Sequence, residues 1–390
     1  MVNYFPEILL EYYRNVLVEQ EHCGFIVKVS SQGSVFKVGN DKDYPFYLRS
    51  CAKPLQAALI IDFGLDEFYG MTSEEIAVCC ASHSGEACHV KIVKGLLDKI
   101  GLDESYLKCG LHKPLSKNEQ EKLILSGEKE NILQNNCSGK HTMMLAICKA
   151  KGWGINDYDN PEHPLQIAIK EKIYELCEIP PTPTLPLKGG GSKSPSSKFL
   201  NKKDSKSGSA CFNSPFPLEG EGWGGGLYPS TQDGCGVPIY SMPLENMVRG
   251  YLNLFLDEKY SKIRDAFLQN PYLIGGEDRL DTAIMSASSP HPNPHPSRGE
   301  GKPSHLIAKV GAGGLCIVVN LEKKEGLIIK IMDSDMKARA TCLIELLRQL
   351  GWLDENMLEN DLIKRQNKKD ILNLHDEKVG WGKCVFEMFL

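Results

Sequence analysis

A serine and a lysine three residues apart, Ser50 and Lys53, are the first residues of this sequence that suggest chemistry. Residues at this spacing share one face of a helix, so both side chains would point the same way. A serine hydroxyl is a poor nucleophile at its ordinary pKa, and a partly desolvated lysine can take its proton. The spacing also has a structural explanation, in which the serine caps a helix and the lysine is solvated. The pair alone does not separate these two interpretations.

Two later motifs favour the chemical interpretation through their order. Ser82 and His83 lie in ASHSGE, just after an apolar helical pattern, and Lys309 lies in AKVG, immediately before a predicted strand. Serine β-lactamases and penicillin-binding proteins show the same order of SxxK, serine loop and Lys-x-Gly strand, and there the three elements line one cleft. In that geometry Lys309 would hold a substrate carboxylate or tune Ser82. Taken singly, Ser82 also fits a helix C-cap or turn, and Lys309 a solvated edge-strand charge.

A group of thiols near a histidine suggests a metal site. Cys137, Lys140 and His141 come from NNCSGKH, which opens a predicted helix, and Cys235 comes from DGCGVP. Thiolate and imidazole ligands suit zinc. No C-x-x-C spacing is present, so two buried free cysteines and an N-capping asparagine are the simpler interpretation without further information. A third interpretation makes Cys137 a nucleophile whose pKa is lowered at a helix N-terminus.

Periodicity along the chain predicts the elements that must position these residues. Alternating patterns predict one hairpin over residues 23–39 and a second over 314–333 that turns at Glu325 and Gly326. Apolar residues at three- and four-residue spacing predict helices between the hairpins and one after the second. The predicted helices cover residues 51–63, 73–81, 86–101, 139–152, 163–178, 244–256 and 336–350. We therefore expect an α+β fold, with an antiparallel sheet formed from both termini and an inserted helical region packed on it.

Two stretches break this periodicity. Residues from about 180 to 229 are rich in Pro, Gly, Ser and Lys, and residues 288–304 are similarly poor in apolar side chains. Such segments bury too little apolar surface to offset chain entropy. We interpret both as low-complexity insertions without a catalytic role.

Bulk properties indicate a globular protein that handles a small molecule. The chain has 390 residues, of which 42% are hydrophobic, and its net charge of -5 argues against nucleic acid or an anionic membrane as the main partner. The N-terminal stretch carries Glu7, Glu11 and Arg14 and does not match a signal peptide. No run approaches the ~20 apolar residues of a membrane span. We expect a cytoplasmic protein whose 14 cysteines are reduced.

Several separated motifs, taken together, resemble the L-asparaginase II family of the rhizobial inducible type. In chain order they are VEQEHCG, LRSCAKPLQ, CCASHSGE, NNCSGKHTMML, DGCGVPIYSMPL, GGEDRLDTAIM, LIAKVGAGG and IKIMDSDMKARA. The resemblance implies a fold like that of serine β-lactamases and penicillin-binding proteins, in a single asparaginase domain over residues 1–390 that the two insertions interrupt. It also implies a homodimer that hydrolyses L-asparagine to L-aspartate and ammonia.

The same resemblance implies roles for individual residues. The catalytic residues would be Ser50, Lys53, Ser82 and Lys309, the zinc ligands would be Cys137, Lys140 and Cys235, and the substrate contacts would be Arg49, His83 and His141. The sequence departs from the family at Gly313, where a glutamate is common, so that position offers no carboxylate.

Our leading hypothesis from the sequence is nucleophilic attack by Ser50 with Lys53 as the base, backbone N–H groups holding the oxyanion, and zinc orienting the substrate. One alternative keeps acyl transfer but changes the substrate to glutamine or a peptide-like amide. Another is a non-catalytic, zinc-containing protein that binds an amino acid.

Overall fold

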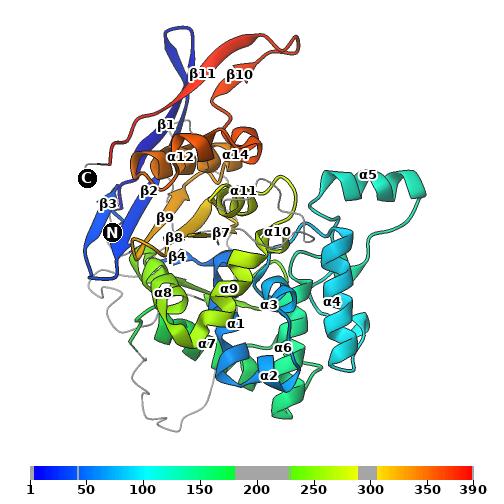
Figure 1. Ribbon diagram of the computed structural model, residues 1–390. Coiled ribbons are helices and arrows are strands. Elements are labelled where there is room, and N and C mark those ends of the chain that lie inside the picture. Colours follow the sequence, from blue (N-terminus) through cyan, green and yellow to red (C-terminus); the bar gives the residue numbers. More distant parts are fainter. Residues whose placement is uncertain (1–3, 42–43, 181–227, 229, 289–304, 389–390) are drawn as a thin grey trace, which may run out of the picture.

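The main feature of the fold is an antiparallel sheet whose strands come from both ends of the chain (Figure 1). The computed structural model describes residues 4–41, 44–180, 228, 230–288 and 305–388. The strands of this sheet are β1 (Glu7–Arg14), β2 (Leu17–Ser30), β3 (Val35–Val38), β7 (Leu306–Gly311), β8 (Leu315–Asn320), β9 (Glu325–Ile331), β10 (Asp370–Leu372) and β11 (Lys378–Cys384). Their order is β10-β11-β1-β2-β9-β8-β7, and β3 also pairs with β2. The predicted α+β architecture is confirmed.

The predicted hairpins are present, with one correction. Strands β2 and β3 pair as expected, and β8 pairs with β9. The second hairpin turns earlier than predicted, because Glu325 pairs with Asn320 and already belongs to β9. The turn lies before it, where Lys324 adopts a left-handed φ of 53°. The Glu-Gly pair is therefore part of a strand, since strand pairing and not local turn chemistry decides its backbone.

Strands β1, β10 and β11 were not predicted. In β11 the glycines interrupt the alternation of side chains that reveals a strand. Gly380 lies so close to its neighbour that a Cβ would reach 2.5 Å from the Tyr13 carbonyl oxygen. The short β10 carries only one partly buried residue, Ile371. These strands are defined by close backbone pairing, which periodicity does not report.

The helical region between the strands supplies most of the candidate site. Its helices are α1 (Ala52–Asp62), α2 (Leu65–Phe68), α3 (Ser73–Cys80), α4 (Ala87–Lys99), α5 (Lys117–Ser126), α6 (Ser138–Lys151), α7 (Pro164–Leu176), α8 (Leu244–Leu256), α9 (Ser261–Gln269), α10 (Pro271–Ile274) and α11 (Leu280–Ala287). After the last central strand follow α12 (Met336–Gln349), α13 (Glu355–Leu358) and α14 (Asp361–Gln366). Helices α1 and α6 are buried along most of their length. A helix that is buried on all sides forms the centre of a domain, and the others pack around these two.

A small second sheet and four single 3-10 turns complete the described structure. The sheet has the order β4-β6-β5, with β4 (Phe46–Tyr47), β5 (Ser230–Gln232) and β6 (Pro238–Met242). The 3-10 turns are η1 (Arg49–Cys51), η2 (Glu104–Tyr106), η3 (Ile132–Gln134) and η4 (Glu258–Tyr260). Strand β4 leads directly into η1, so this sheet fixes the chain just before Ser50.

The two predicted insertions fall almost wholly outside the described residues, which omit 181–227, 229 and 289–304. Within the part of the chain that the structure does describe, no helix combines the length and apolar composition needed to cross a bilayer.

Helices α3 and α6 touch at the ends that carry site residues. Gly139, in the first turn of α6, packs so closely on α3 that a Cβ there would overlap the Val78 carbonyl oxygen. The contact brings the chain that follows α3, which contains Ser82, next to the chain that opens α6, which contains Cys137 and Lys140. A glycine is required at this position by packing, since its φ is not left-handed.

Replacing Gly139 by alanine should therefore force the two helices apart and lower the free energy of unfolding by about 1–3 kcal/mol, the usual cost of overpacking. Gly95 is the matched control, because it lies in the interior of α4 and a Cβ there meets no atom within 4 Å. Gly95→Ala should raise the free energy of unfolding by about 0.5–1 kcal/mol through helix propensity. Urea unfolding of both variants measures the two changes, and equal effects would contradict the packing argument.

Candidate active site

Lys53 is the residue around which the other candidate residues gather. It lies in the first turn of α1 and is only 1% exposed. Its Nζ donates to the Ala81 carbonyl at 2.8 Å and the Asn136 carbonyl at 2.9 Å, and it lies 3.0 Å from the Ser82 Oγ. Burial lowers the pKa of Lys53. The amine thus joins α1 to the loop after α3 and to the loop before α6.

The partners of Lys53 determine which serine its nitrogen can deprotonate. Carbonyl oxygens only accept hydrogen bonds, so Ala81 and Asn136 take both hydrogens of a neutral amine. A third partner is the Ser82 Oγ at 3.0 Å, and the Cys137 side chain also hydrogen-bonds to Lys53. A serine and a lysine in contact can act as a nucleophile and its base.

Ser50 lies at a strained bend between β4 and α1. The residue before it, Arg49, has a left-handed φ of 50°, which costs a non-glycine residue about 1–3 kcal/mol. Hydrogen bonds from Leu48 N to Tyr240 O, at 3.1 Å, and from Tyr251 OH to Cys51 O, at 2.8 Å, hold the bend. Ser50 itself is half-buried. Its hydroxyl makes no hydrogen bond with Lys53 or with any other described residue.

Arg49 is tied to the segment that carries Cys235. Its Nε lies 3.0 Å from the Asp233 Oδ1, which also accepts a 2.9 Å hydrogen bond from Gly234 N. The arginine side chain is 40% exposed, so part of the guanidinium stays open to solvent while one edge is paired. Asp233 was not singled out in the sequence. Its position two residues before Cys235 would have been the only signal.

Lys309 occupies the middle of β7, where every residue is buried. Its Nζ donates to the Val310 carbonyl at 3.1 Å and lies 3.7 Å from the Asp281 Oδ2. Burial lowers the pKa of Lys309 to about 8, although Asp281 acts in the opposite direction. Asp281 was also missed in the sequence. The signal was a single carboxylate in the otherwise apolar start of a helix, LDTAIM.

Cys137, Lys140 and Cys235 form one buried cluster. Lys140 Nζ lies 2.9 Å from the Cys235 Sγ, and the two thiols hydrogen-bond to each other. The hydrogen bond from Cys235, together with Lys53 and Lys140, lowers the pKa of Cys137 well below its ordinary value. Burial acts to lower the pKa of Lys140, but the two cysteines outweigh it and raise it. Two sulfurs and one amine that converge in a dry site fit zinc as ligands, provided that the amine is neutral.

His141 has one ring nitrogen without a partner among the described residues. Lys108 N donates to the Tyr158 hydroxyl at 2.9 Å, and this hydroxyl lies 2.7 Å from the His141 Nδ1. We assign the tautomer in which the Tyr158 hydroxyl donates to Nδ1. The hydrogen of a neutral imidazole then sits on Nε2. Burial lowers the pKa of His141 well below its ordinary value, which keeps the ring neutral. Its Nε2 is buried and makes no hydrogen bond to the described residues.

Comparison with known families agrees with this clustering of motifs. A family model described as L-asparaginase II matches residues 10–186 and 227–383. The chain belongs to the L-asparaginase II family. The resemblance inferred from the separated motifs is therefore confirmed.

Solved structures similar to this asparaginase II chain include a β-lactamase from Mycobacterium bovis, which shares 12% identity with a TM-score of 0.37 over 84% of this chain and 94% of that one. A β-lactamase candidate from Bacteroides dorei is 12% identical to this chain, with a TM-score of 0.33. The match covers 79% of this chain and 84% of that one. Likenesses of this size carry no argument about fold or function. No curated protein matches the sequence.

His83 has both ring nitrogens engaged inside the asparaginase II fold. Gly85 N donates to its Nδ1 at 3.2 Å, and its Nε2 lies 3.0 Å from the Ser138 Oγ. The Ser138 hydroxyl gives its hydrogen to the Leu133 carbonyl, so it accepts from His83. Burial lowers the pKa of His83 well below its ordinary value. In this geometry the ring braces the loop that carries Ser82 against the start of α6.

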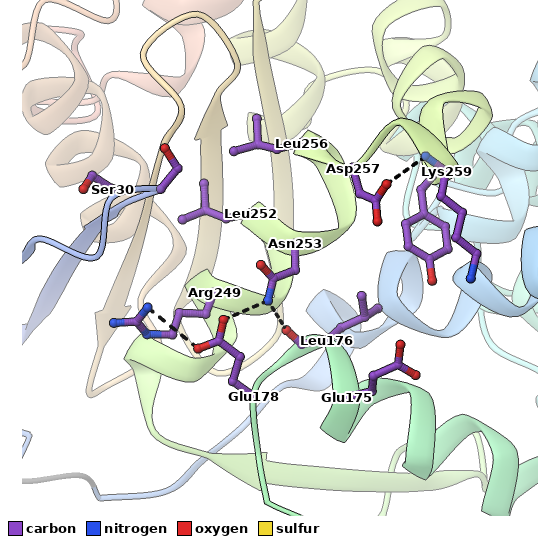
Figure 2. Close-up of a pocket in the computed structure, with 12 residues that line it drawn as sticks. Ser30, Glu175, Leu176, Glu178, Arg249, Leu252, Asn253, Leu256, Asp257 and Lys259 are labelled. Atoms are coloured by element: carbon purple, nitrogen blue, oxygen red, sulfur yellow. Dashed lines mark hydrogen bonds and ion pairs between the residues drawn. The ribbon is translucent and has the colours of Figure 1, made fainter.

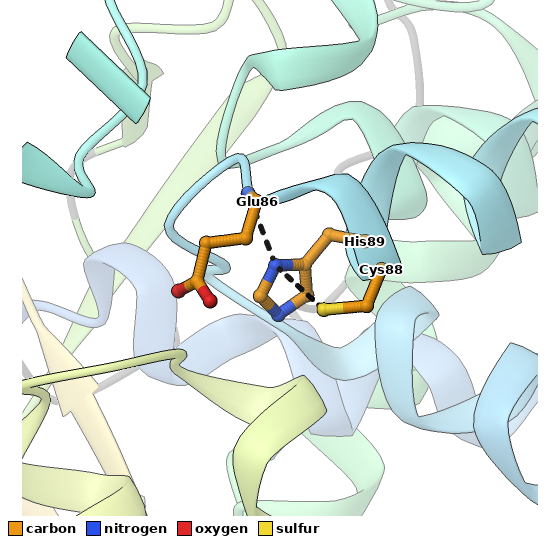
Figure 3. A group of neighbouring side chains, drawn as sticks. All are labelled: Glu86, Cys88 and His89. Atoms are coloured by element: carbon orange, nitrogen blue, oxygen red, sulfur yellow. Dashed lines mark hydrogen bonds between the residues drawn. The ribbon is translucent and has the colours of Figure 1, made fainter. Parts of the chain in front are cut away.

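A second group with metal-ligand chemistry, Glu86, Cys88 and His89, lies behind this loop (Figure 3). Figure 3 shows the His89 ring between the Glu86 carboxylate and the Cys88 thiol. His89 Nδ1 accepts from Glu86 N at 3.2 Å and its Nε2 lies 3.4 Å from the Tyr272 carbonyl, so neither nitrogen has a free lone pair. The Glu86 carboxylate already accepts hydrogen bonds from Tyr272 OH and Glu277 N. The group is a structural network, and its atoms fit a metal poorly.

A cavity of about 530 Å³ lies between α7 and α8 (Figure 2). None of its lining residues belongs to the serine and lysine cluster. Figure 2 shows its polar side chains paired with one another, as in the 3.1 Å hydrogen bond from Asn253 to Glu178. This cavity is therefore separate from the candidate site, which is identified by the chemistry of its residues.

Proposed function

We propose that the protein is an amidohydrolase that converts L-asparagine and water to L-aspartate and ammonia. Membership of the L-asparaginase II family supports the amidohydrolase class. The observation that carries the mechanism is the 3.0 Å hydrogen bond between Lys53 Nζ and Ser82 Oγ, across which a neutral amine can take the hydroxyl proton.

In the proposed reaction, Lys53 takes the proton of the Ser82 hydroxyl and Ser82 Oγ attacks the side-chain amide carbon of asparagine. The C–N bond then breaks, and Lys53 returns the proton to the leaving nitrogen, which departs as ammonia. Water attacks the resulting ester and gives its proton to Lys53. The C–O bond to Ser82 breaks, the serine recovers its proton, and aspartate leaves.

The geometry supports a different division of roles between the serines than the sequence suggested. The sequence favoured Ser50 as the nucleophile, but its hydroxyl makes no described hydrogen bond to the base. Ser50 is more exposed than Ser82 and lies at the strained bend, where its hydroxyl is free to contact the substrate. Lys309 would supply a positive charge close to the reacting group.

His141 would contact an acceptor oxygen of the substrate through its Nε2 hydrogen, the one donor of the ring that no described residue uses. The open edge of the Arg49 guanidinium would bind a substrate carboxylate while Asp233 holds its Nε. Cys137, Lys140 and Cys235 would hold zinc, which when bound would supply positive charge and a rigid wall beside the substrate. We further propose a homodimer, which the family resemblance implies, and a cytoplasmic location, which the N-terminal sequence favours.

Replacing Ser82 by alanine should lower kcat for ammonia release from asparagine by at least about a thousandfold, as expected when a nucleophile is removed. Ser50→Ala is the matched variant and should retain far more activity, because Lys53 keeps its serine partner. Steady-state assays of both variants compare the two roles. An active Ser82→Ala enzyme together with an inactive Ser50→Ala enzyme would show that Ser50, and not Ser82, is the nucleophile.

Two substitutions of His141 should distinguish the roles of its two ring nitrogens. His141→Asn keeps an acceptor for the Tyr158 hydroxyl and loses the distal donor, whereas His141→Gln keeps a donor near the position of Nε2. We expect His141→Asn to lower kcat/KM by about 5- to 150-fold, the equivalent of one buried hydrogen bond. His141→Gln should recover part of the loss. Equal activity of the two variants would show that the Nε2 donor does not reach the substrate.

Zinc content tests the thiol cluster. Elemental analysis should find zinc in the purified protein, and Cys137→Ser and Cys235→Ser should each lose it. Cys88→Ser is the control and should keep zinc, because Cys88 belongs to the internally bonded group with His89. Since thiolate and amine ligands must be deprotonated, zinc should also dissociate as the pH falls. Loss of zinc from Cys88→Ser alone would place the metal at the other group.

One assay separates the proposed reaction from its alternatives. Ammonia release from asparagine and from glutamine identifies the preferred amide, and a labelled β-lactam reports a penicillin-binding type of site. Binding of asparagine without ammonia release would indicate a non-catalytic protein and would contradict the proposal.

A further inference from the structure

The most deeply buried ion pair of the described structure joins Asp281 on α11 to Lys309 on β7. Both side chains are fully shielded from solvent, and Oδ2 lies 3.7 Å from Nζ. Moving a charged group out of water is costly unless an opposite charge and hydrogen bonds compensate it. No mechanism given above uses the carboxylate, so its burial requires a separate explanation.

Both charged groups are tied to the same residue of β7. Val310 N donates to the Asp281 Oδ2 at 3.3 Å, and the Val310 carbonyl accepts from Lys309 Nζ at 3.1 Å. Strand β7 is the last strand in the order of the main sheet, so its outer backbone groups need partners other than a strand. The carboxylate therefore fixes the strand edge and the lysine head group together.

The surroundings of Lys309 contain other groups that act on its charge. The groups whose charges interact with that of Lys309 are Asp281, Lys53, Cys51, Arg279, Cys80 and Cys316. The two cations among them, Lys53 and Arg279, disfavour a charge on Lys309. Arg339 reaches the same corner from α12, where it donates to the Gly311 carbonyl at 3.1 Å. The Asp281 carboxylate has the opposite effect and favours the protonated form of Lys309.

We propose that Asp281 is a positioning residue that keeps Lys309 protonated and fixed on β7, so that Lys309 serves as a standing positive charge in the site. The two lysines differ in their partners. Lys53 is hydrogen-bonded to two carbonyls, the Ser82 hydroxyl and the Cys137 side chain, whereas Lys309 faces the Asp281 carboxylate, which favours an ammonium group. The role in catalysis rests on the proposed function, but the charge state of Lys309 does not.

Asp281→Asn tests this role directly, because the substitution keeps the shape of the side chain and removes its charge. NMR titration of protein with 13C-labelled lysine side chains measures the pKa of Lys309, and Lys309→Arg assigns its signal. The pKa should fall by about one unit or more in Asp281→Asn, as expected for the loss of an adjacent opposite charge. Asp278→Asn is the matched control, since this exposed side chain pairs with Arg365 among the described residues, and it should leave the pKa of Lys309 unchanged. An unchanged pKa in Asp281→Asn would overturn the proposal.

The pH dependence of activity gives a second readout. Activity that needs protonated Lys309 falls as the pH rises through its pKa, so the alkaline limb of kcat/KM should move to lower pH in Asp281→Asn. If the NMR titration shows the lower pKa of Lys309 but the alkaline limb of kcat/KM does not move, the proposed role of Asp281 in catalysis is overturned. Absence of asparaginase activity in the unaltered protein would contradict the proposed function and leave the NMR result standing.

A folding defect in Asp281→Asn has its own test. The double variant Asp281→Asn with Lys309→Met removes both charges and leaves neither one unpaired. It should unfold at higher urea concentration than Asp281→Asn alone. If the double variant were the less stable of the two, Asp281 would be serving a partner other than Lys309, and the proposal would fail.

Discussion

The burial of one amine, that of Lys53, is the constraint on which the site depends. A lysine that is 1% exposed must place its nitrogen against acceptors, and those acceptors come from two other segments of the chain. The loop after α3 and the loop before α6 can reach the nitrogen together only because Gly139 lets the two helices touch. The hydrogen bonds that the buried Lys53 amine requires therefore depend on the close packing of α3 and α6.

A second segment, between α9 and β7, secures the opposite side of the site. Ser82 N donates to the Ile274 carbonyl at 3.0 Å, and Ser84 Oγ donates to the Gly275 carbonyl at 2.8 Å. The same segment continues into α11 and delivers Asp281 to β7. One stretch of chain therefore positions both Ser82 and Lys309, which are far apart in the sequence. Because the same segment supports both residues, it fixes the position of Ser82 relative to Lys309.

The sequence was sufficient for the architecture and the family but not for the pairing of side chains. Periodicity predicted the central helices and two hairpins because their faces are buried regularly, whereas the glycines of β11 concealed a strand. The order of motifs indicated that Ser50, Lys53, Ser82 and Lys309 belong to one site. Which serine meets Lys53 depends on the bend at Arg49 and on the carbonyls of Ala81 and Asn136. Backbone groups carry no side-chain signature, so no reading of residue types could have found them.

The two carbonyl bonds to Lys53 have a consequence for how this site can change during evolution. Backbone oxygens are present whatever the side chain, so exchanges at positions 81 and 136 leave the anchoring of the amine intact as long as the backbone path is kept. Variation there can alter the shape of the substrate cavity while the base stays in place. Ser82 and Cys137 contact Lys53 through their side chains, so a single substitution can delete either contact. The arrangement separates positions that are free to diversify from two that are not.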